Sequence, residues 1–360
     1  MAACLLTGCG IYGKYTRPDM EIEAQYRHAE NTADTATIAS LSWREFFTDT
    51  CLQALIEHGL QRNTDLQIAH LKVEEAEAVL MNTRLSYLPA LSLSPEADVG
   101  RYVGNTSKTY RIAASASWEL DIFGKNTNAR RGASAALDGS RDYVQAVQTR
   151  LIATIADSYY TLLMLDRQFN IGKQTLESWE KSIRTLEALK RAGKANDAAV
   201  LQARANRIAL ESSILALRKS IADTENSLTA LLALPSQHIA RGTLLETTLP
   251  ESVSVGIPVQ LLANRPDVRQ AERNLAQAFY ATNAARAAFY PNISLSGMLG
   301  WTNNSGGSIL NPGHWLLNAI GSLTQPLFNK GTNIANLKIA EARQEEAKLQ
   351  FRQSLLDAGK

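Results

Sequence analysis

The sequence has few cysteines, little net charge and no long apolar run. Its 37 basic and 35 acidic residues leave a formal charge of +2, whereas nucleic-acid-binding proteins normally carry a concentrated basic excess. No stretch approaches the roughly 18 consecutive apolar residues that a membrane-spanning helix requires. The three cysteines, at positions 4, 9 and 51, are spaced for neither a disulfide framework nor a zinc site. These absences argue against a nucleic-acid partner, a helical membrane span and a site built from cysteines.

Patterns typical of catalysis are also missing. The five histidines never form a metal-ligand pair, and no glycine-rich phosphate loop is present. The stretch Ser178–Lys181 (SWEK) matches the S-x-x-K pattern of serine acylases, but its companion motifs are absent and it lies in the middle of a predicted helix. We therefore expect no enzyme activity, no cofactor and no metal site.

The N-terminus carries a short motif with a specific chemical meaning. Leu6-Thr7-Gly8-Cys9 resembles a bacterial lipobox, in which the signal peptide is cut before the cysteine and the thiol receives a diacylglyceryl group. The motif predicts that Cys9 is a lipid anchor. The alternative is an ordinary buried cysteine, since cysteine often fills a small apolar space.

A unit of about 200 residues occurs twice along the chain. Leu60–Ser94 aligns without a gap onto Leu262–Ser296, and Phe123–Asn128 aligns onto Phe328–Asn333. The first unit continues for well over a hundred residues after its phenylalanine, whereas the second stops at Lys360. We therefore expect a duplicated half-protein that is truncated at the C-terminus within its second repeat.

The expected organisation has four parts. They are 1–9, the end of a signal peptide with the lipobox; 10–50, an extended leader; 51–250, the first repeat; and 251–360, the second, incomplete repeat.

Each repeat is predicted to contain a helix, two strands and then long helices. The first helices are expected to begin at Asn63 and Pro266 and to stop near Pro89 and Pro291, because the opening residues suit an N-terminus and proline ends a helix. The residues after each proline switch to period two, which is typical of strands. The predicted strands span about 91–103, 110–122, 293–302 and 315–324, with a turn at 104–107.

The second strand alternates most clearly between apolar and polar residues. Its polar side chains include Ser115, Ser117 and Glu119, and its predicted lipid-facing side chains are Ile112, Ala114, Ala116 and Trp118. Strands of about ten residues span a membrane when tilted. The alternation is equally typical of a soluble antiparallel sheet with one buried face. In lipid, four strands must close by oligomerisation because open edges are not tolerated there, and three copies supply twelve strands.

The region after the second strand predicts a long helical hairpin. Residues 125–190 contain no proline, so one helix could reach about 100 Å at 1.5 Å per residue. Seven-residue apolar series, such as Leu165, Gly172, Trp179 and Leu186, predict a coiled-coil seam with a return helix over about 197–234. Gly193 is the expected left-handed cap in the turn between the two helices.

Together these features resemble one family. The lipobox, the paired repeats, Leu120–Lys125 (LDIFGK), Arg265–Val268 (RPDV) and Tyr290–Leu295 (YPNISL) are similar to TolC-type outer-membrane factors, specifically the lipoprotein branch of OprM-like efflux channels. The resemblance implies a mainly α-helical fold with a small β part. It further implies a homotrimer in which each protomer lends four strands to a twelve-stranded outer-membrane β-barrel and long coiled-coil helices to a periplasmic tunnel.

The resemblance also implies function and partners. Such a protein is a passive conduit, anchored in outer-membrane lipid, that works with a periplasmic adaptor and an inner-membrane RND-type pump to export drugs, metals or other small compounds. A type I secretion channel and a soluble periplasmic coiled-coil scaffold are the alternatives.

The resemblance places an adaptor-contact tip at the turn of the helical hairpin. The family pattern there is glycine, then serine three residues on, aspartate six on and alanine ten on. In this chain the implied tip residues are Gly193, Lys194, Asn196, Ala199 and Ala203. The serine and the aspartate are replaced, so the strength and choice of the adaptor contact are open.

Overall fold

The computed structural model describes residues 12–19, 42–102, 105–244, 265–302 and 314–358. The chain forms two compact units. The first combines Met1–Ala24, Lys72–Tyr143 and Val259–Lys360, and the second combines Gln25–Leu71 and Val144–Pro258. Two helices, α3 (Thr64–Leu85) and α4 (Lys125–Arg191), contribute residues to both units.

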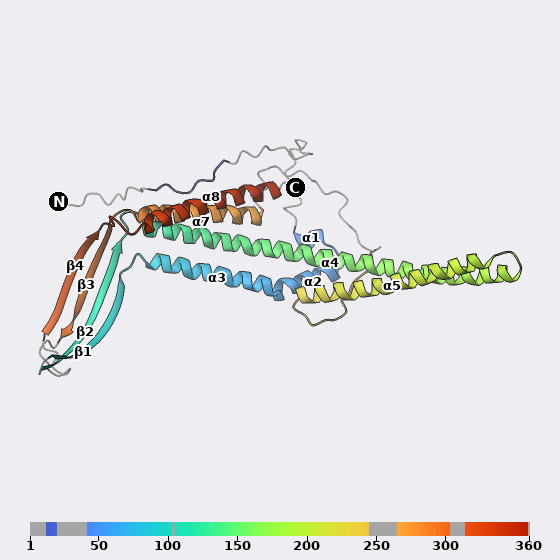
Figure 1. Cartoon of the computed structure of the whole chain (residues 1–360), viewed down its shortest axis with the longest axis horizontal. Coiled ribbons are helices and arrows are strands. Elements are labelled where there is room, and N and C mark those ends of the chain that lie inside the picture. The colour runs from blue at the N-terminus through green and yellow to red at the C-terminus, as the bar shows by residue number, and fades with distance from the viewer. Residues whose placement is uncertain (1–11, 20–41, 103–104, 245–264, 303–313, 359–360) are drawn as a thin grey trace. The chain divides into compact units, whose positions relative to one another are not determined.

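The first unit contains a sheet of four antiparallel strands in the order β1-β2-β3-β4 (Figure 1). The strands are β1 (Ala90–Tyr102), β2 (Asn105–Leu120), β3 (Asn292–Thr302) and β4 (His314–Thr324). All four predicted strands are therefore confirmed. The predicted turn at 104–107 is wrong in part, because β2 already begins at Asn105 and pairs that residue with Tyr102. The backbone pairing with β1 continues through Asn105 and Thr106, although residues of this kind are typical of turns.

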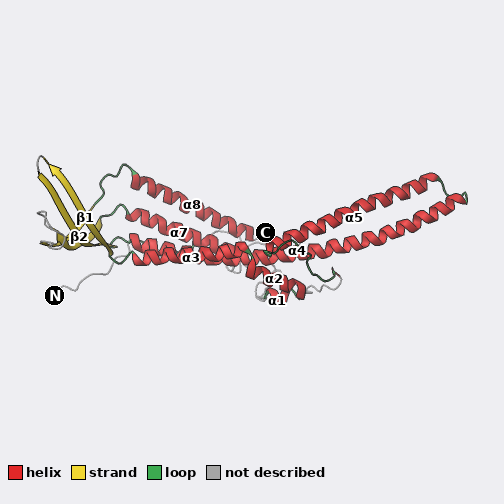
Figure 2. Ribbon diagram, turned by 90° about the horizontal axis from the view of Figure 1, so that it is seen from below, coloured by secondary structure: helices red, strands yellow, loops and turns green. Residues whose placement is uncertain are grey.

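Two helices lie wholly within the first unit. They are α7 (Pro266–Ala287) and α8 (Thr332–Ala358), which lie side by side in both views (Figures 1 and 2). A small apolar core joins them, formed by Val268, Leu275, Ala347 and Phe351. The first helix of each repeat ends as expected, since α3 and α7 each stop shortly before the proline that precedes a strand.

The second unit holds the helical hairpin. The distal part of α4 runs beside α5 (Asp197–Leu231) to a tight turn (Figure 2). The predicted seam is confirmed: Leu165, Gly172 and Ile183 are buried, and the seam residues between them are half-buried. Space is tight at Gly172, where a Cβ atom would lie 3.1 Å from Ile214 Cγ1. The two helices therefore approach closely at that point.

The return helix is shorter than predicted. It ends at Leu231 rather than near residue 234, because Ala233 adopts a left-handed conformation with φ of 52°. The Leu234 amide donates to Thr229 O at 2.9 Å, and the Asn63 side-chain amide donates to Leu231 O at 2.9 Å. These bonds satisfy carbonyls at the helix end that would otherwise lack partners.

Two short helices complete the second unit. They are α1 (Trp43–Phe46) and α2 (Thr50–Arg62). Leu52 and Ile56 of α2 are fully buried, and a Cβ atom added to Gly59 would lie 2.5 Å from Ile155 Cδ1. The helix α2 therefore packs directly against α4.

Candidate functional site: a two-faced sheet and a helical hairpin

One face of the sheet is apolar across all four strands. The register places Ala116 opposite Leu91 and Gly297, and Leu299 opposite Ala114 and Leu317. Many large apolar side chains on this face are exposed, including Leu317 at 83% and Leu91 at 79%. Such a continuous exposed apolar surface is typical of a face that contacts lipid or a partner.

The four residues predicted to face lipid all lie on this apolar face. They are Ile112, Ala114, Ala116 and Trp118, which alternate along β2. Ile112, Ala114 and Trp118 are exposed, and Ala116 is half-buried. Their contact with lipid stays a prediction.

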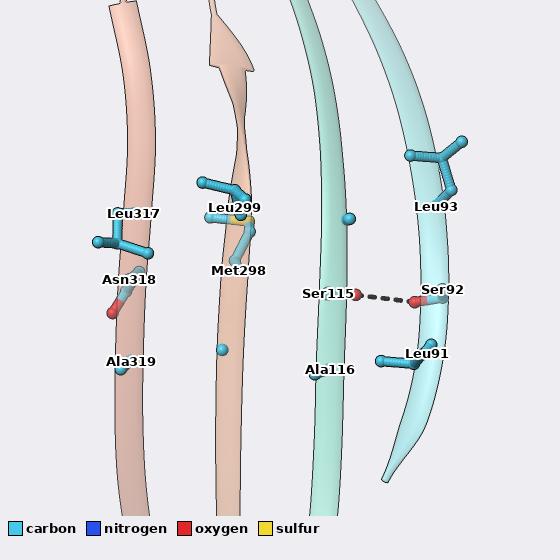
Figure 3. Close-up of a pocket in the computed structure, with 12 residues that line it drawn as sticks. Leu91, Ser92, Leu93, Ser115, Ala116, Met298, Leu299, Leu317, Asn318 and Ala319 are labelled. Atoms are coloured by element: carbon cyan, nitrogen blue, oxygen red, sulfur yellow. Dashed lines mark hydrogen bonds between the residues drawn. The ribbon is translucent and has the colours of Figure 1, made fainter.

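The opposite face is mainly polar. Ser92 and Ser115 share a hydrogen bond of 2.7 Å between their hydroxyls, drawn as the dashed line in Figure 3. Ser294 and Ser322 make an equivalent 2.7 Å bond between β3 and β4. Arg111 of β2 forms an ion pair with a glutamate of β1. Cross-strand polar pairs of this kind stabilise a sheet on the side that meets water.

Residues in the middle of the sheet are uncharged and include both small and large side chains. A hollow of about 610 Å³ is lined by residues of all four strands, among them Leu91, Ala116, Met298 and Ala319 (Figure 3). At Gly300 a Cβ atom would lie 2.3 Å from Ile112 O. Glycine is therefore needed there for β2 and β3 to pair.

The outer strands each have one neighbour among the described strands. These are β1 and β4, at the two ends of the strand order. Pro95 lies within β1, and proline in a sheet is normally confined to an edge strand or a bulge. An unpaired edge presents free backbone groups that favour addition of another strand.

The start of α4 is fixed by an aspartate that sequence reasoning did not single out. The Asp121 carboxylate accepts hydrogen bonds from the backbone amides of Asn126 at 2.8 Å and Thr127 at 2.7 Å. A carboxylate at a helix N-terminus satisfies free amides and interacts favourably with the helix dipole. The second repeat has Pro326 at the aligned position, and α8 begins only at Thr332. In the sequence, this cap is visible as the aspartate of LDIFGK, four residues before the helix begins.

The turn of the hairpin has the predicted geometry. Gly193 has φ of +73°, its amide donates to Lys190 O at 2.9 Å, and the Lys194 amide donates to Leu189 O at 2.8 Å. This pair of bonds is a Schellman motif with glycine as the left-handed cap. Asn196 caps α5, because its Oδ1 accepts from the Ala199 amide at 2.9 Å.

The predicted tip residues differ in accessibility. Gly193, Lys194 and Asn196 are exposed, and Ala199 is half-buried. Ala203 is 3% exposed and packs inside the hairpin, so its side chain offers no surface to a partner in this conformation. The structure thus places the first three at the tip and Ala203 in the helix interface behind it.

An ion cluster at the base of the hairpin was missed by the sequence analysis. The Arg241 side chain, 6% exposed, donates to Asp166 through Nε at 2.6 Å and Nη2 at 3.1 Å, and to Glu225 through Nη1 at 2.5 Å. These bonds, chiefly those to Asp166, raise the pKa of Arg241 above its usual value. Nearby, the Tyr159 hydroxyl donates to Asp49 at 2.6 Å, and burial raises the pKa of this tyrosine.

Residues 12–19 form a segment, called the strap below, that contacts α7 of the first unit. The Tyr15 amide donates to the Tyr280 hydroxyl at 3.2 Å, and Arg17 forms an ion pair of 2.7 Å with Glu272. Tyr12 lies near the start of α4, since a Cβ atom on Gly124 would lie 3.8 Å from its ring. Cys9, the predicted lipid anchor, lies outside the described residues.

No helix in the described part of the chain is long and apolar enough to cross a membrane. The same described ranges hold no group of three or more histidine, cysteine, aspartate or glutamate residues placed to bind a metal ion.

The fold and these surfaces define an outer-membrane efflux component. Residues 55–234 and 257–360 match the family described as outer membrane efflux protein, and the chain belongs to that family. It is a channel component of an efflux system in the outer membrane and not an enzyme.

Particular relatives make the similarity concrete. The chain is 32% identical to the cation efflux system protein CusC of Escherichia coli K12 over 368 residues, which cover 99% of this chain and 80% of the relative. It is 31% identical to a probable outer membrane lipoprotein, SilC, of Salmonella typhimurium, covering 99% of this chain and 79% of that protein. A crystal structure of CusC superposes with a TM-score of 0.82 at 30% identity, covering 98% of this chain and 81% of the other. The outer-membrane channel OprN gives a TM-score of 0.85 at 26% identity, covering 97% and 80%.

Proposed function

We propose that three copies of this chain form the outer-membrane conduit of a tripartite efflux system. The observation that carries the proposal is the four-stranded sheet, which combines an exposed apolar face, a polar face and two outer strands with one neighbour each. In lipid every backbone polar group needs a partner, so such a sheet has to close with further strands. Three copies supply twelve strands, whereas two supply eight, whose interior is filled by side chains.

We also propose how the conduit meets its partners. A periplasmic adaptor contacts the hairpin turn through Gly193, Lys194 and Asn196, which are exposed. Ala199 is a half-buried neighbour of that surface, and Ala203 acts by allowing close helix packing. An inner-membrane RND-type pump delivers the cargo. Asn196 and Ala199 stand where the family has serine and aspartate, so the adaptor contact here differs in these two side chains, while Asp197 keeps an exposed carboxylate beside them.

The cargo is proposed to be small toxic compounds, with metal cations as the first class to test. Relatives at 31–32% identity are described as cation efflux system proteins, and one at 29% as a toluene efflux pump outer membrane protein. Selection is assigned to the pump, because a barrel of twelve strands is wider than a single small ligand requires.

Cys9 is proposed as the lipid anchor. The lipobox-like stretch Leu6-Thr7-Gly8-Cys9 supports this proposal. Acyl chains on the thiol would add membrane affinity.

A complementation experiment tests the proposed function. The chain is expressed with its adaptor and pump in a strain lacking its own outer-membrane factor, and growth is measured with metal cations, organic solvents and antibiotics. Restored resistance to at least one class, dependent on the pump, is expected. Membrane-inserted trimers that never restore resistance would contradict the efflux role, and protein found only as periplasmic monomer would contradict the conduit.

A further inference from the structure

Two stacked aromatic rings join the repeats inside one chain. Phe123 follows β2, and Tyr290 precedes β3. Their ring centroids lie 5.1 Å apart with an angle of 13° between the rings. Because β2 and β3 are neighbours, with Leu120 opposite Ile293, the stacked pair covers the base of the seam between the repeats.

The aligned residues of the other repeat are more exposed than the stacked pair, in which Phe123 is half-buried and Tyr290 is 41% exposed. The alignment places Phe328 on Phe123 and Leu88 on Tyr290. Phe328 follows β4 and is 86% exposed, and Leu88 precedes β1 and is 61% exposed. They therefore stand at the bases of the two outer strands, as the stacked pair stands at the bases of the two inner ones.

The helix before β1 shows the same pattern. On α7, Tyr280 lies against α4, where a Cβ atom on Gly132 would be 3.5 Å away, and Ala287 is 5% exposed. The aligned residues on α3 are Ala78 and Leu85, which are both exposed, Leu85 at 52%. The helix positions that are packed in the second repeat are therefore exposed to solvent in the first.

We propose that Phe328 of one copy packs on Leu88 of the next copy and repeats, between chains, the contact that Phe123 and Tyr290 make within one. The occupant of the exposed surface is a second copy, because the duplicated sequence already contains both halves of the contact. The inference rests on the proposed trimer and adds the residues that join its protomers.

The strand register gives an independent check. Within the chain, Trp118 of β2 lies opposite Leu295 of β3 on the apolar face. The same alignments carry this pair onto Leu323 of β4 and Leu93 of β1. Both residues are on the apolar face, and they are 67% and 69% exposed. If β4 of one copy and β1 of the next were shifted by one residue, an apolar side chain would lie on the polar face. The aligned register pairs Leu323 with Leu93 and keeps each face continuous between the two copies.

Thiol crosslinking of the full chain in outer membranes tests the contact. Leu88→Cys and Phe328→Cys are combined in a Cys51→Ser background and treated with a short bis-maleimide. We expect a ladder of covalent dimers and trimers on denaturing gels from the double variant and only monomers from each single variant. The pair Phe123→Cys and Tyr290→Cys should link within one chain and give no ladder. The pair Leu88→Cys and Ile339→Cys controls for distance and should give no ladder. Ile339 is an exposed residue of α8, further along the chain than Phe328.

The outcomes separate this inference from the proposed function. Trimers that survive in mild detergent but give no covalent ladder would contradict the contact between Phe328 and Leu88. The proposed trimer would not be contradicted by that result. The absence of trimers by native mass measurement would overturn both. A charge test does not depend on crosslinking: Phe328→Glu and Leu88→Lys should each lower the trimer fraction, and the double variant should restore it. No restoration in a folded double variant would count against the contact.

Discussion

A single arginine organises the base of the hairpin. Arg241 is almost fully buried, and its planar guanidinium pairs with Asp166 of α4 and Glu225 of α5. Only arginine presents several donors in a fixed fork that can serve two carboxylates together. The same side chain donates to Ile239 O at 2.9 Å, so it also holds the segment that follows α5.

Replacement of Arg241 should destabilise the second unit strongly. Arg241→Met leaves Glu225 buried without its main partner, and losing one member of a buried ion pair costs about 3 kcal/mol. Arg241→Lys should cost less, because the charge is kept but the fork is lost. Denaturant unfolding measures the change. Arg204→Met is the control: Arg204 is exposed and pairs with Glu187, so its loss should cost well under about 1 kcal/mol. Equal effects of the methionine variants at 204 and 241 would contradict this account.

A second residue makes the strap sensitive to high pH. Burial, followed by the nearby Glu272 charge, raises the pKa of Tyr15 from 10.0 to about 12. The neutral form is favoured in the folded state, so this contribution to stability is complete below pH 10 and is lost as pH rises from about 10 to about 12.

Titration of tyrosine absorbance tests the strap. Tyr15→Phe should remove one group that ionises near pH 12. The difference titration between the two proteins isolates this residue. If the missing group ionises near 10 instead, the ring is not buried under the conditions of the experiment.

At the scale of elements, the sheet is defined by its two faces. Trp118 and Ala116 alternate with Ser117 along β2, and the register extends each face across β1 and β3. The apolar face continues on β4 through residues such as Leu317 and Leu323. An antiparallel sheet with one polar and one apolar face suits either a lipid contact or a protein contact. The chain belongs to an outer-membrane family, and the lipid contact of this particular face stays a prediction.

Arginine scanning of adjacent positions tests which face meets lipid. Ala116→Arg should reduce the stability of the inserted protein by about 2–4 kcal/mol, because a charge near the bilayer midplane is costly. Ser117→Arg, one residue further along β2, should be tolerated because its side chain points to the polar face. The measurement is the denaturant stability of protein refolded into lipid vesicles. Similar losses at both positions would reject the assignment of Ile112, Ala114, Ala116 and Trp118 to lipid.

At the scale of the whole molecule, the strap (residues 12–19) contacts helices of the second repeat. Arg17 lies 5.5 Å from the ring centroid of Phe351 in α8 and pairs with Glu272 in α7. These contacts hold the strap against α7 and α8. The effect of strap docking and the proposed effect of Cys9 lipidation can therefore be tested separately.

A Cys9→Ser variant should separate these contributions. Mass measurement of the mature N-terminus should show an acylated Cys9 in the unchanged protein and no acyl group in the variant. The variant should lose outer-membrane yield, because acyl chains add membrane affinity with each buried methylene, about 0.8 kcal/mol. Tryptic cleavage of the strap after Lys14 should stay slow. An unmodified Cys9 in the unchanged protein would remove the basis for the anchor.

Much of the fold follows from patterns that are local along the chain. Period two along β2, the seven-residue series on α4 and α5, and the glycine of the hairpin turn each express a backbone geometry within a few residues. The repeat itself needed only comparison of the chain with itself. These features were correctly predicted because short-range sterics and the separation of polar from apolar side chains are enough to determine them.

The tertiary structure decided what depends on residues far apart in sequence. The Arg241 cluster joins side chains 75 residues apart, and the strap contact between Tyr15 and Tyr280 spans 265. The end of α5 is also stabilised across a long sequence separation, because the Asn63 side-chain amide donates to Leu231 O, 168 residues away. No local propensity encodes these contacts, because their free energy arises only when packing removes water from both partners at once. The sequence alone therefore determined the elements, the two faces of β2 and the duplication, while packing decided where elements end and which charges are buried.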